Sequence, residues 1–239
     1  MKNKINYDLH IHTCLSPCGD IDMTPNNIIN MSVLNNMDVI AITDHNTCKN
    51  CEPVMRLGKA VGIKVIPGME LCTAEEIHVI CLFPSIDNAM QFSSYVNSRL
   101  PNIKNDDKVF GEQVVMDEND NAVSRESKLL LNATDIGIYD VYNIINRYSG
   151  LVFPSHIDRS SYSILSCLGA LPHDLDITLT ELTYKADIKE ILRKTPRLNN
   201  IGLLFNSDAH RLEQLRECGK PISVEDTTMK PLIDLINKI

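Results

Sequence analysis

Short apolar runs recur along this chain, and several of them end at a histidine or a carboxylate. Residues 5–9 lead to His10, and residues 39–43 lead to Asp44 and His45. A strand buried on both faces is a continuous apolar run, and in a parallel α/β sheet polar ligand groups collect beyond the carboxyl ends of the strands. We therefore expect an α/β fold in which these side chains meet in space.

The same arrangement continues through the rest of the chain. Six of the seven histidines stand at or just past the ends of such runs, and several have a carboxylate close by. Neutral imidazoles and carboxylates bind Zn, Mn or Fe, and a carboxylate can bridge two ions. The pattern therefore predicts a multi-metal hydrolase site. The ordered series of candidate residues is His10, His12, Asp20, Asp44-His45, Glu70, His78, His156, Asp208 and His210.

The first pair of histidines is the simplest local signal. In His10-Ile11-His12 the two imidazoles are two residues apart, so on a strand both leave the same face and can bind one ion. Such a pair alone is weak evidence, because short motifs often occur by chance. The ordered series that follows it carries the prediction.

Composition restricts the class of protein and of partner. A chain of 239 residues with 44% hydrophobic content suits one large α/β domain over residues 1–239. The net charge of −8 and the pI near 5.3 oppose a broad electrostatic footprint for DNA or RNA, and the absence of Trp weakens the case for base stacking. We expect a small phosphorylated substrate, with nucleic acid disfavoured except as a nucleotide-sized substrate.

Compartment and membrane association follow from the apolar pattern and the cysteines. No apolar stretch approaches the length that spans a bilayer, and residues 1–4 lead into a strand-like run without a signal-peptide core. Eight cysteines in a chain of this length fit a reducing compartment better than a disulfide framework. We expect a cytoplasmic protein with no membrane partner; the pattern leaves its oligomeric state open.

Strand-like runs alternate with helix-like segments, as in repeated βα units around a parallel sheet or barrel. Thr24-Pro25 is typical of an N-cap followed by proline at the first helical position, and Gly62 should end a helix that opens at Glu52-Pro53. Further helices are expected over 86–100, 138–148 and 231–239, and further strands near 177–182 and 203–206.

Residues 101–131 interrupt this rhythm. Two apolar pieces at 114–116 and 122–123 flank a polar stretch at 117–121, which predicts an inserted β-hairpin rather than a βα unit. The insertion either covers the mouth of the site or is a solvated surface hairpin.

The motifs together resemble the PHP (polymerase and histidinol phosphatase) family of metal-dependent phosphoesterases. They span residues 7–210 in the order of the family. The matching segments are His10-Ile11-His12-Thr13 with Ser16 and Asp20, Thr43-Asp44-His45, Gly68-Met69-Glu70, His78, His156 and Ser207-Asp208-Ala209-His210. The resemblance implies a distorted (β/α)7 barrel with two or three divalent metal ions (Zn, Mn or Fe) at its C-terminal mouth.

The resemblance also implies a ligand set for each ion. The first ion would take His10, His12, Glu70 and Asp208; the second would share Glu70 and add His78 and His156; the third would take Asp20, His45 and His210. Asp22 is the alternative to Asp20. Two-metal logic then predicts that a water held between the first two ions is acidified to hydroxide and attacks phosphorus in line.

Other polar residues near these motifs have candidate roles. Asp44 should orient a ligand or shuttle a proton, because carboxylates behind the ligands fix imidazole tautomers. Arg159 and Arg211 are the cations best placed to grip a phosphate, with a solvated helix start as the alternative for Arg211. His173 lies outside the motifs and is interpreted as a turn or capping residue.

Two cysteine pairs follow the first two motifs. Cys14-x3-Cys18 and Cys48-x2-Cys51 could bring four thiols together as an auxiliary metal or redox site. The alternative is four separate reduced thiols near the mouth of the site.

The leading functional hypothesis is a metal-dependent phosphoesterase that hydrolyses a small phosphorylated metabolite or nucleotide through a metal-bridging hydroxide. Two alternatives stay open. One is an amidohydrolase-like enzyme that cleaves C–N or C–O bonds, since similar His-rich barrels use bridging hydroxide on carbonyl carbon. The other is a non-catalytic module that binds a phosphate ligand.

Overall fold

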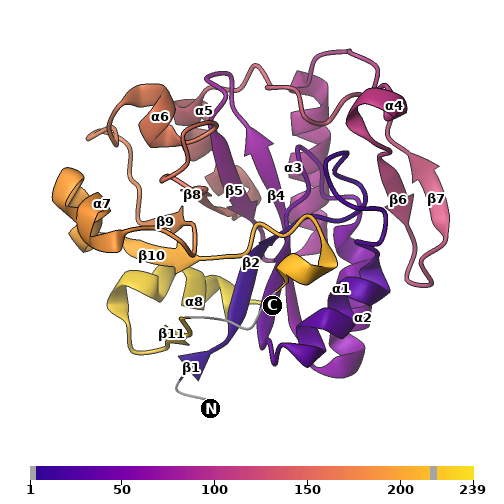
Figure 1. The fold of residues 1–239 in the computed structure, drawn as a ribbon, viewed down its shortest axis with the longest axis horizontal. Coiled ribbons are helices and arrows are strands. Elements are labelled where there is room, and N and C mark those ends of the chain that lie inside the picture. Colours follow the sequence, from indigo (N-terminus) through magenta and orange to yellow (C-terminus); the bar gives the residue numbers. More distant parts are fainter. Residues whose placement is uncertain (1–3, 216–219) are drawn as a thin grey trace.

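The computed structural model describes residues 4–215 and 220–239 as an α/β fold whose main sheet curls around the centre of the molecule (Figure 1). Five strands form this sheet in the order β2-β3-β4-β5-β8. Their bounds are β2 Tyr7–Ile11, β3 Val39–Ile42, β4 Lys64–Cys72, β5 His78–Leu82 and β8 Leu151–Pro154. Strands β2, β3 and β4 are parallel, and β5 runs antiparallel to both β4 and β8.

A parallel pair, β9 (Leu179–Leu182) and β10 (Gly202–Phe205), continues the curl. Thr180 Oγ1 donates to Pro154 O at 3.2 Å, which ties β9 to β8. The segment after β10 returns to β2, where Ile11 and Ala209 form a parallel bridge. The two edges of the curled sheet therefore approach each other beside the start of the chain.

The uniform βα alternation expected from the sequence fails between β4 and β5. These strands pair antiparallel over Gly68–Cys72 and His78–Leu82, with only residues 73–77 between them. A parallel connection needs a crossover of about a dozen residues or more, so this short link forces a hairpin. The α/β class and the curl of the sheet hold, whereas the seven-fold βα repeat stays a prediction.

The helices begin and end where local signals place them. Helix α1 (Pro25–Leu34) starts after Thr24, whose side chain accepts a hydrogen bond from Asn27 N, and α2 (Cys51–Val61) ends at Gly62 with φ 82°. The predicted helix over 86–100 forms as α3 (Ile86–Arg99) with Ser85 as its cap. In each case the capping residue satisfies backbone groups that the helix itself leaves unpaired.

The remaining elements are short. The helices are α4 Asp107–Phe110, α5 Ile138–Ile144, α6 Ile164–Leu168, α7 Ile188–Lys194 and α8 Lys230–Ile236. Single 3-10 turns cover Ile145–Tyr148, Pro196–Asn200, Leu212–Gln214 and Thr227–Met229. Strand β1 (Lys4–Ile5) pairs antiparallel with β11 (Ile222–Ser223).

The predicted insertion forms a hairpin of β6 (Val114–Met116) and β7 (Ala122–Arg125). It lies at one side of the molecule beside α1 and α4 (Figure 1), where Thr24 Oγ1 donates to Asp120 Oδ2 at 2.8 Å. All four residues of β7 are exposed. Val114 and Met116 of β6 are buried, and the hairpin residues do not line the cavity described below.

Two apolar layers cover the faces of the curled sheet. Buried side chains such as Ile29, Val54 and Phe92 pack α1, α2 and α3 on one face. On the other face, Leu232 and Ile236 of α8 pack against the sheet residues. Within residues 4–215 and 220–239, no helix has both the length and the apolar character that a membrane crossing requires.

Candidate metal centre

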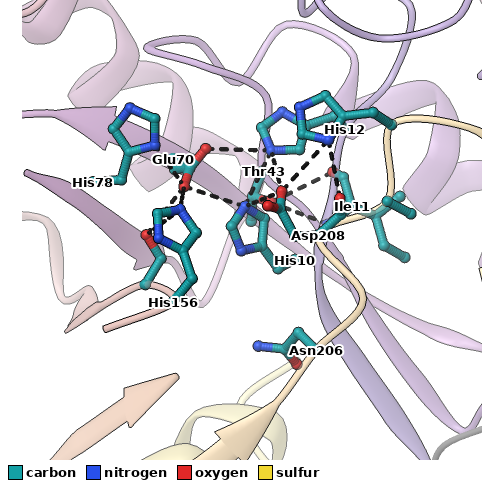
Figure 2. A network of polar contacts seen from close by, with 12 residues as sticks. His10, Ile11, His12, Thr43, Glu70, His78, His156, Asn206 and Asp208 are labelled. Atoms are coloured by element: carbon teal, nitrogen blue, oxygen red, sulfur yellow. Dashed lines mark hydrogen bonds and ion pairs between the residues drawn. The ribbon is translucent and has the colours of Figure 1, made fainter. Parts of the chain in front are cut away.

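Figure 2 shows the imidazoles of His10, His78 and His156 around the carboxylates of Glu70 and Asp208, with His12 beside them. They lie within strands of the sheet or in the segments that follow them. The donors are His10 in β2 and His12 after it, His45 after β3, Glu70 in β4, His78 at the start of β5, His156 after β8, and Asp208 and His210 after β10. The expectation that residues distant in sequence meet at one place is therefore confirmed for these positions.

Glu70 lies at the centre of this cluster. Its Oε1 is 3.0 Å from His78 Nδ1, 3.1 Å from His156 Nε2 and 3.3 Å from His10 Nε2. Its Oε2 is 3.1 Å from His45 Nδ1 and 3.3 Å from His12 Nε2. A single carboxylate thus faces five imidazoles, which is the position required of a bridge between two cations.

Asp208 approaches the same histidines from the opposite strand. Its Oδ1 is 3.1 Å from His10 Nε2 and 3.3 Å from His12 Nε2. His210, two residues on, stacks on His12 with ring centroids 4.1 Å apart. The chain between β10 and the first 3-10 turn after it therefore supplies donors to the same histidines as β2.

Three groups of these donor atoms are close enough to surround an ion. Each group has its ligand atoms within 4.8 Å of one another. The groups are His10, His12, Glu70 and Asp208; His45, Glu70 and His78; and His12, His45 and His210. The first group equals the set that the sequence assigned to the first ion, and the other two share members with the sets assigned to the second and third.

The imidazole of His10 is held in one tautomer. Its Nδ1 lies 3.1 and 3.0 Å from the two carboxylate oxygens of Glu181, both side chains being fully buried. A carboxylate accepts, so Nδ1 carries the proton and Nε2 presents a lone pair to Glu70 and Asp208. Although burial opposes it, nearby carboxylates raise the pKa of His10, so in the absence of metal a proton occupies the place that a cation would take.

Asp44 holds His12 through a serine. Ser16 Oγ donates to Asp44 Oδ1 at 2.7 Å and therefore accepts from His12 Nδ1 at 2.9 Å. Thr13 fixes the same carboxylate, since its N and Oγ1 both donate to Asp44 at 2.7 Å. The tautomer of His12 is set in the same sense as that of His10, with Nε2 turned into the cluster.

Three buried atoms test whether this cluster fits cations. Glu70 Oε2, Asp208 Oδ1 and His156 Nδ1 have no hydrogen-bond partner among the described residues. Buried polar atoms without partners are rare and costly. The two carboxylate oxygens face imidazole nitrogens, and a divalent cation between them would remove that cost. The donor set is therefore suited to the metals that bind imidazole and carboxylate together.

The protonation states reflect the crowding of charges. Burial lowers the pKa of His12, but its contacts with the carboxylates of Asp208 and Glu70 outweigh burial and raise it to about 9. Burial and the positive charge of His12 lower the pKa of His210 to about 4 and hold that of His45 well below its usual range. Although burial opposes ionisation of Glu70, His78 and His10 hold its pKa well below the ordinary value. The carboxylate is therefore ionised at neutral pH.

Two of the donors occupy left-handed backbone conformations. His156 has φ 28° and Asp208 has φ 50°. Side chains with a Cβ rarely adopt this region, and such strain persists where surrounding contacts over-determine it. His156 N donates to Glu181 Oε1 at 3.1 Å, which is one of those contacts.

A cavity of about 650 Å³ opens beside the cluster. His156, Asp208 and Arg159 line it. Arg159 Nη2 donates to Asp208 Oδ2 at 2.6 Å, and 45% of the Arg159 side chain is exposed. Arg159 therefore reaches both the candidate ligands and the space in which a substrate would lie.

Other residues proposed from the sequence stand apart from the cluster. The side chain of Asp20 is exposed and its Oδ1 accepts from Asp22 N at 3.0 Å, although Asp20 N donates to His210 O at 2.8 Å. Arg211 is exposed and precedes a 3-10 turn, and it does not line the cavity. His173 is exposed in a turn. Asp20 thus adjoins the cluster through its backbone only.

The four thiols do not gather into one site. Cys51 Sγ points at Ile42 O and Gly68 O inside the main core, and Cys14 Sγ points at Val114 O at 3.7 Å. Cys18 is exposed. Within the described residues no ion-holding group contains a cysteine, so the structure does not support an auxiliary metal site, and the redox role stays a prediction. Packing of Cys48 and Cys51 into the helix–sheet core accounts for the spacing.

Glu181 and Asn206 were missed by the sequence analysis. Glu181 holds His10 and His156, and Asn206 Nδ2 donates to Glu181 Oε2 at 2.7 Å while its Oδ1 accepts from Leu9 N. The sequence does contain a signal for Glu181, because it is a glutamate inside the apolar run 177–182. A charged residue in a buried strand is rare unless it is paired with another polar group.

Comparison with known proteins places these observations in a family. The sequence profile described as the PHP domain matches residues 8–166. The chain is 36% identical over 88 residues to an uncharacterized protein of Methanocaldococcus jannaschii, covering 34% of this chain and 51% of that protein. It is 32% identical over 79 residues to a 5'-3' exoribonuclease of Haemophilus influenzae, covering 32% of this chain and 28% of that protein. The matches thus span about half or less of these relatives.

Solved structures share the fold. A lesion-specific endonuclease from Pyrococcus furiosus has a TM-score of 0.67 at 19% identity, covering 99% of this chain and 56% of that one. Endonuclease Q bound to a 27-mer duplex substrate with an abasic lesion at the active site has a TM-score of 0.62 at 16% identity, covering 96% and 56%. A putative metal-dependent phosphoesterase of Bifidobacterium adolescentis has a TM-score of 0.60 at 16% identity, covering 97% and 96%.

These structures correct the expectation of a small phosphorylated substrate with nucleic acid disfavoured. That expectation was wrong because it rested on the net charge of −8, whereas the fold is shared with an enzyme that holds a duplex at its active site. Net charge averages over the whole surface, but the potential in a cleft is set by local cations and bound metals.

The profile covers the donors from His10 to His156, whereas Asp208 and His210 lie beyond it. Residues 8–166 are more than half of the 239 residues. The protein therefore belongs to the PHP domain family of metal-dependent hydrolases.

Proposed function

We propose that this chain hydrolyses phosphodiester bonds of a nucleic-acid strand with two or three divalent cations of Zn, Mn or Fe. The observation that carries the proposal is the convergence of five imidazoles on the buried carboxylate of Glu70, beside a cavity that the cluster itself lines. Cations bound there would supply Lewis-acid activation of water and neutralise charge on phosphorus.

The ligands proposed for the cations combine the resemblance with the geometry, in which the first set agrees and His45 groups with Glu70 and His78. His10, His12, Glu70 and Asp208 would hold the first cation, and Glu70 with His78 and His156 the second. His45 and His210 would hold the third, with Asp20 able to join only if its carboxylate turns from Asp22 N toward the cluster. His12 lies beside His45 and His210 and is the nearer third donor.

Residues around the cluster would orient the metal ligands and bind the phosphate of the substrate. Glu181 and the Ser16–Asp44 pair hold the imidazoles of His10 and His12 with Nε2 turned inward. Arg159, a bidentate donor at the cavity wall, would exchange its contact with Asp208 for a phosphate oxygen. Arg211 would contact the nucleic-acid substrate at a greater distance from the metal cluster than Arg159 does, since it is exposed beside His210.

Two comparisons support nucleic acid as the substrate class. A relative with 32% identity over 79 residues is a 5'-3' exoribonuclease, and endonuclease Q shares the fold and binds duplex DNA with an abasic lesion. Local charge is compatible with this, because Arg159, Lys185 and Lys220 line the cavity of an otherwise acidic chain.

The test is a substrate screen with purified protein reconstituted with Mn²⁺, Zn²⁺ or Fe²⁺. Single-stranded and abasic duplex oligonucleotides should be cut only with metal, whereas amides and lactones should not. His12→Ala and Asp208→Ala should each lower kcat/KM by about a hundred-fold or more, as loss of a metal or a charge-stabilising group does. His173→Ala is the matched control, because His173 is exposed in a turn outside the cluster, and it should keep full activity.

Different results would point to the other functions. Hydrolysis of amides or lactones without phosphodiester cleavage would favour the C–N and C–O hydrolase. Full metal occupancy with no hydrolysis of any substrate would favour a binding module. Phosphodiester cleavage that survives both His12→Ala and Asp208→Ala would show that the site lies elsewhere.

A further inference from the structure

The cavity beside the cluster extends well past the candidate metal ligands. At about 650 Å³ it lies within the range of about 300–1,000 Å³ typical of small-ligand sites. Besides His156 and Asp208, its wall includes residues from the segment after β9, from α7 and from the end of β10. In Figure 1 these elements form the side of the molecule opposite the β6–β7 hairpin. Most of this wall plays no part in holding metal.

The acidic residues of the cavity wall are buried, whereas its arginine and lysine residues are exposed to solvent. The acidic lining residues Asp8, Glu181 and Asp208 are all buried, and they are engaged with the cluster or with backbone groups. The exposed charged residues of the lining are all cations: Arg159, Lys185 and Lys220. A ligand in this cavity therefore meets positive charge, in a chain whose net charge is −8.

Aromatic rings accompany two of these cations. Lys185 Nζ lies 5.4 Å from the centroid of the Tyr184 ring, and Lys220 Nζ lies 4.7 Å from the centroid of the Phe205 ring. Tyr184 is 55% exposed, which is more than a core ring would be. Aromatic faces beside ammonium groups are the combination that binds a nucleobase and its phosphate.

We propose that Tyr184, Lys185, Phe205 and Lys220 form a subsite for one nucleotide next to the scissile phosphate. The base stacks on the aromatic rings and the neighbouring phosphate contacts the two lysines. This inference rests on the proposed function, and it names residues that set affinity for the strand beside those that carry out hydrolysis. These four residues line the same cavity as Arg159, so the subsite adjoins the proposed phosphate contact.

The test measures binding separately from cleavage. A fluorescent single-stranded oligonucleotide with phosphorothioate linkages is titrated with metal-loaded protein, and the anisotropy gives Kd over a range of salt concentrations. Tyr184→Ala should weaken binding about ten-fold, within the range for loss of one base-stacking contact, and should leave the salt dependence unchanged. Tyr184→Phe, which keeps the ring, should bind like the wild type.

Replacing the lysines should change the salt dependence of binding, which replacing Tyr184 should not. Lys185→Ala and Lys220→Ala should each reduce the slope of log Kd against log salt concentration by about one, since each removes one phosphate contact. Lys189→Ala on α7 is the matched control for Lys185, and Tyr139→Ala is the control for Tyr184. Both control residues are exposed and neither lines the cavity.

Each outcome separates the subsite from the catalytic proposal. Wild-type affinity in Tyr184→Ala, or unchanged salt slopes in both lysine variants, overturns the subsite. So does failure of the wild type to bind the oligonucleotide. The predicted losses of binding, in a protein that does not cut the unmodified oligonucleotide, support the subsite and overturn only the proposed hydrolysis.

Discussion

Glu181 is the residue on which the orientation of the imidazole cluster depends most. Its carboxylate contacts His10 Nδ1 through both oxygens, accepts from His156 N, and accepts from Asn206 Nδ2. One buried side chain thus aligns a donor from β2 with the backbone of a donor that follows β8. Groups behind metal ligands commonly matter almost as much as the ligands.

Glu181→Gln should loosen metal binding without unfolding the protein. The amide is similar in size but binds the Nδ1 proton of His10 more weakly than a carboxylate does, so metal affinity should fall about 10–100-fold. Competition with a chromophoric chelator measures the affinity. Glu190→Gln, an exposed position paired with Lys194 on α7, is the control. Equal affinity in Glu181→Gln and the wild type would remove Glu181 from the positioning role.

Metal affinity should rise with pH, because His12 must lose a proton before it can bind a cation. Its pKa is raised to about 9 in the metal-free protein, so it is protonated at neutral pH and must lose that proton to bind a cation. Affinity should therefore increase about ten-fold for each displaced proton and each pH unit up to about pH 9. Calorimetry in two buffers of different ionisation enthalpy should detect proton release at pH 7, decreasing as the pH passes 9.

His45 and His210 should contribute nothing to that release. Burial holds the pKa of both below the usual range, to about 4 for His210, so neither has a proton to lose near neutrality. Metal binding at pH 7 with no proton release at all would contradict the assignment of His12 as a protonated ligand in the metal-free state.

Among the elements, the β4–β5 hairpin decides where Glu70 stands. Glu70 is inside β4 rather than at its end, and its backbone N lies 3.2 Å from both Thr43 O and Asp44 O at the end of β3. The neighbouring strand β5 begins at His78, whose Nδ1 faces Glu70. The antiparallel turn therefore brings two ligands from adjacent strands to the same place.

Gly68→Ala should destabilise this hairpin and disturb the metal centre. A Cβ at Gly68 would lie 2.8 Å from Cys81 O and 2.8 Å from Leu82 Cδ2, and 3.2 Å from Thr43 Cγ2. The clash sits between β3 and β5, where backbone cannot yield cheaply, and overpacking of this kind costs about 1–3 kcal/mol. Thermal denaturation of the metal-free protein measures the loss.

The control for that change is Val123→Ala on the exposed strand β7. Val123 is 65% exposed, so its truncation should alter stability by less than about 0.5 kcal/mol. Equal melting temperatures for Gly68→Ala and the wild type would mean that the strands can separate at this point and that Gly68 has no steric role.

At the level of elements, the ends of helices could be predicted from the sequence, whereas the direction in which strands pair could not. Thr24-Pro25 and Gly62 mark helix ends through contacts within a few residues, so α1 and α2 appear where expected. The direction of β5 depends on which strand it meets in space. Its apolar run is the same whether it pairs parallel or antiparallel, which is why the expected βα repeat failed there.

For the whole molecule, removal of metal should lower stability markedly. Without a cation, Glu70 and Asp208 bury oxygens that accept no hydrogen bond within the described parts of the chain. A ligand at 1,000 times its Kd stabilises a fold by about 4 kcal/mol, and about 2–4 °C of melting temperature corresponds to each kcal/mol in a chain of this size. Chelation should therefore lower Tm by about 10 °C.

Scanning fluorimetry with and without EDTA, followed by metal addition, measures this shift. Recovery of Tm on adding Mn²⁺, Zn²⁺ or Fe²⁺ distinguishes metal loss from an unspecific effect of the chelator. Asp208→Ala supplies the control, since its Tm should respond less to EDTA. A wild-type Tm that is indifferent to chelator would show that the cluster does not bind cations.

The sequence alone indicated the candidate donors and the apolar runs beside them, because a strand buried on both faces is a continuous apolar run. It also determined the helix caps. It did not show that Glu70 lies inside β4 rather than at its end. Tertiary structure decided which donors lie close enough to share an ion, that Glu181 supports His10, and that Asp20 keeps its side chain outside. These outcomes depend on strand direction and on distances between segments far apart in the chain, and no local preference encodes them.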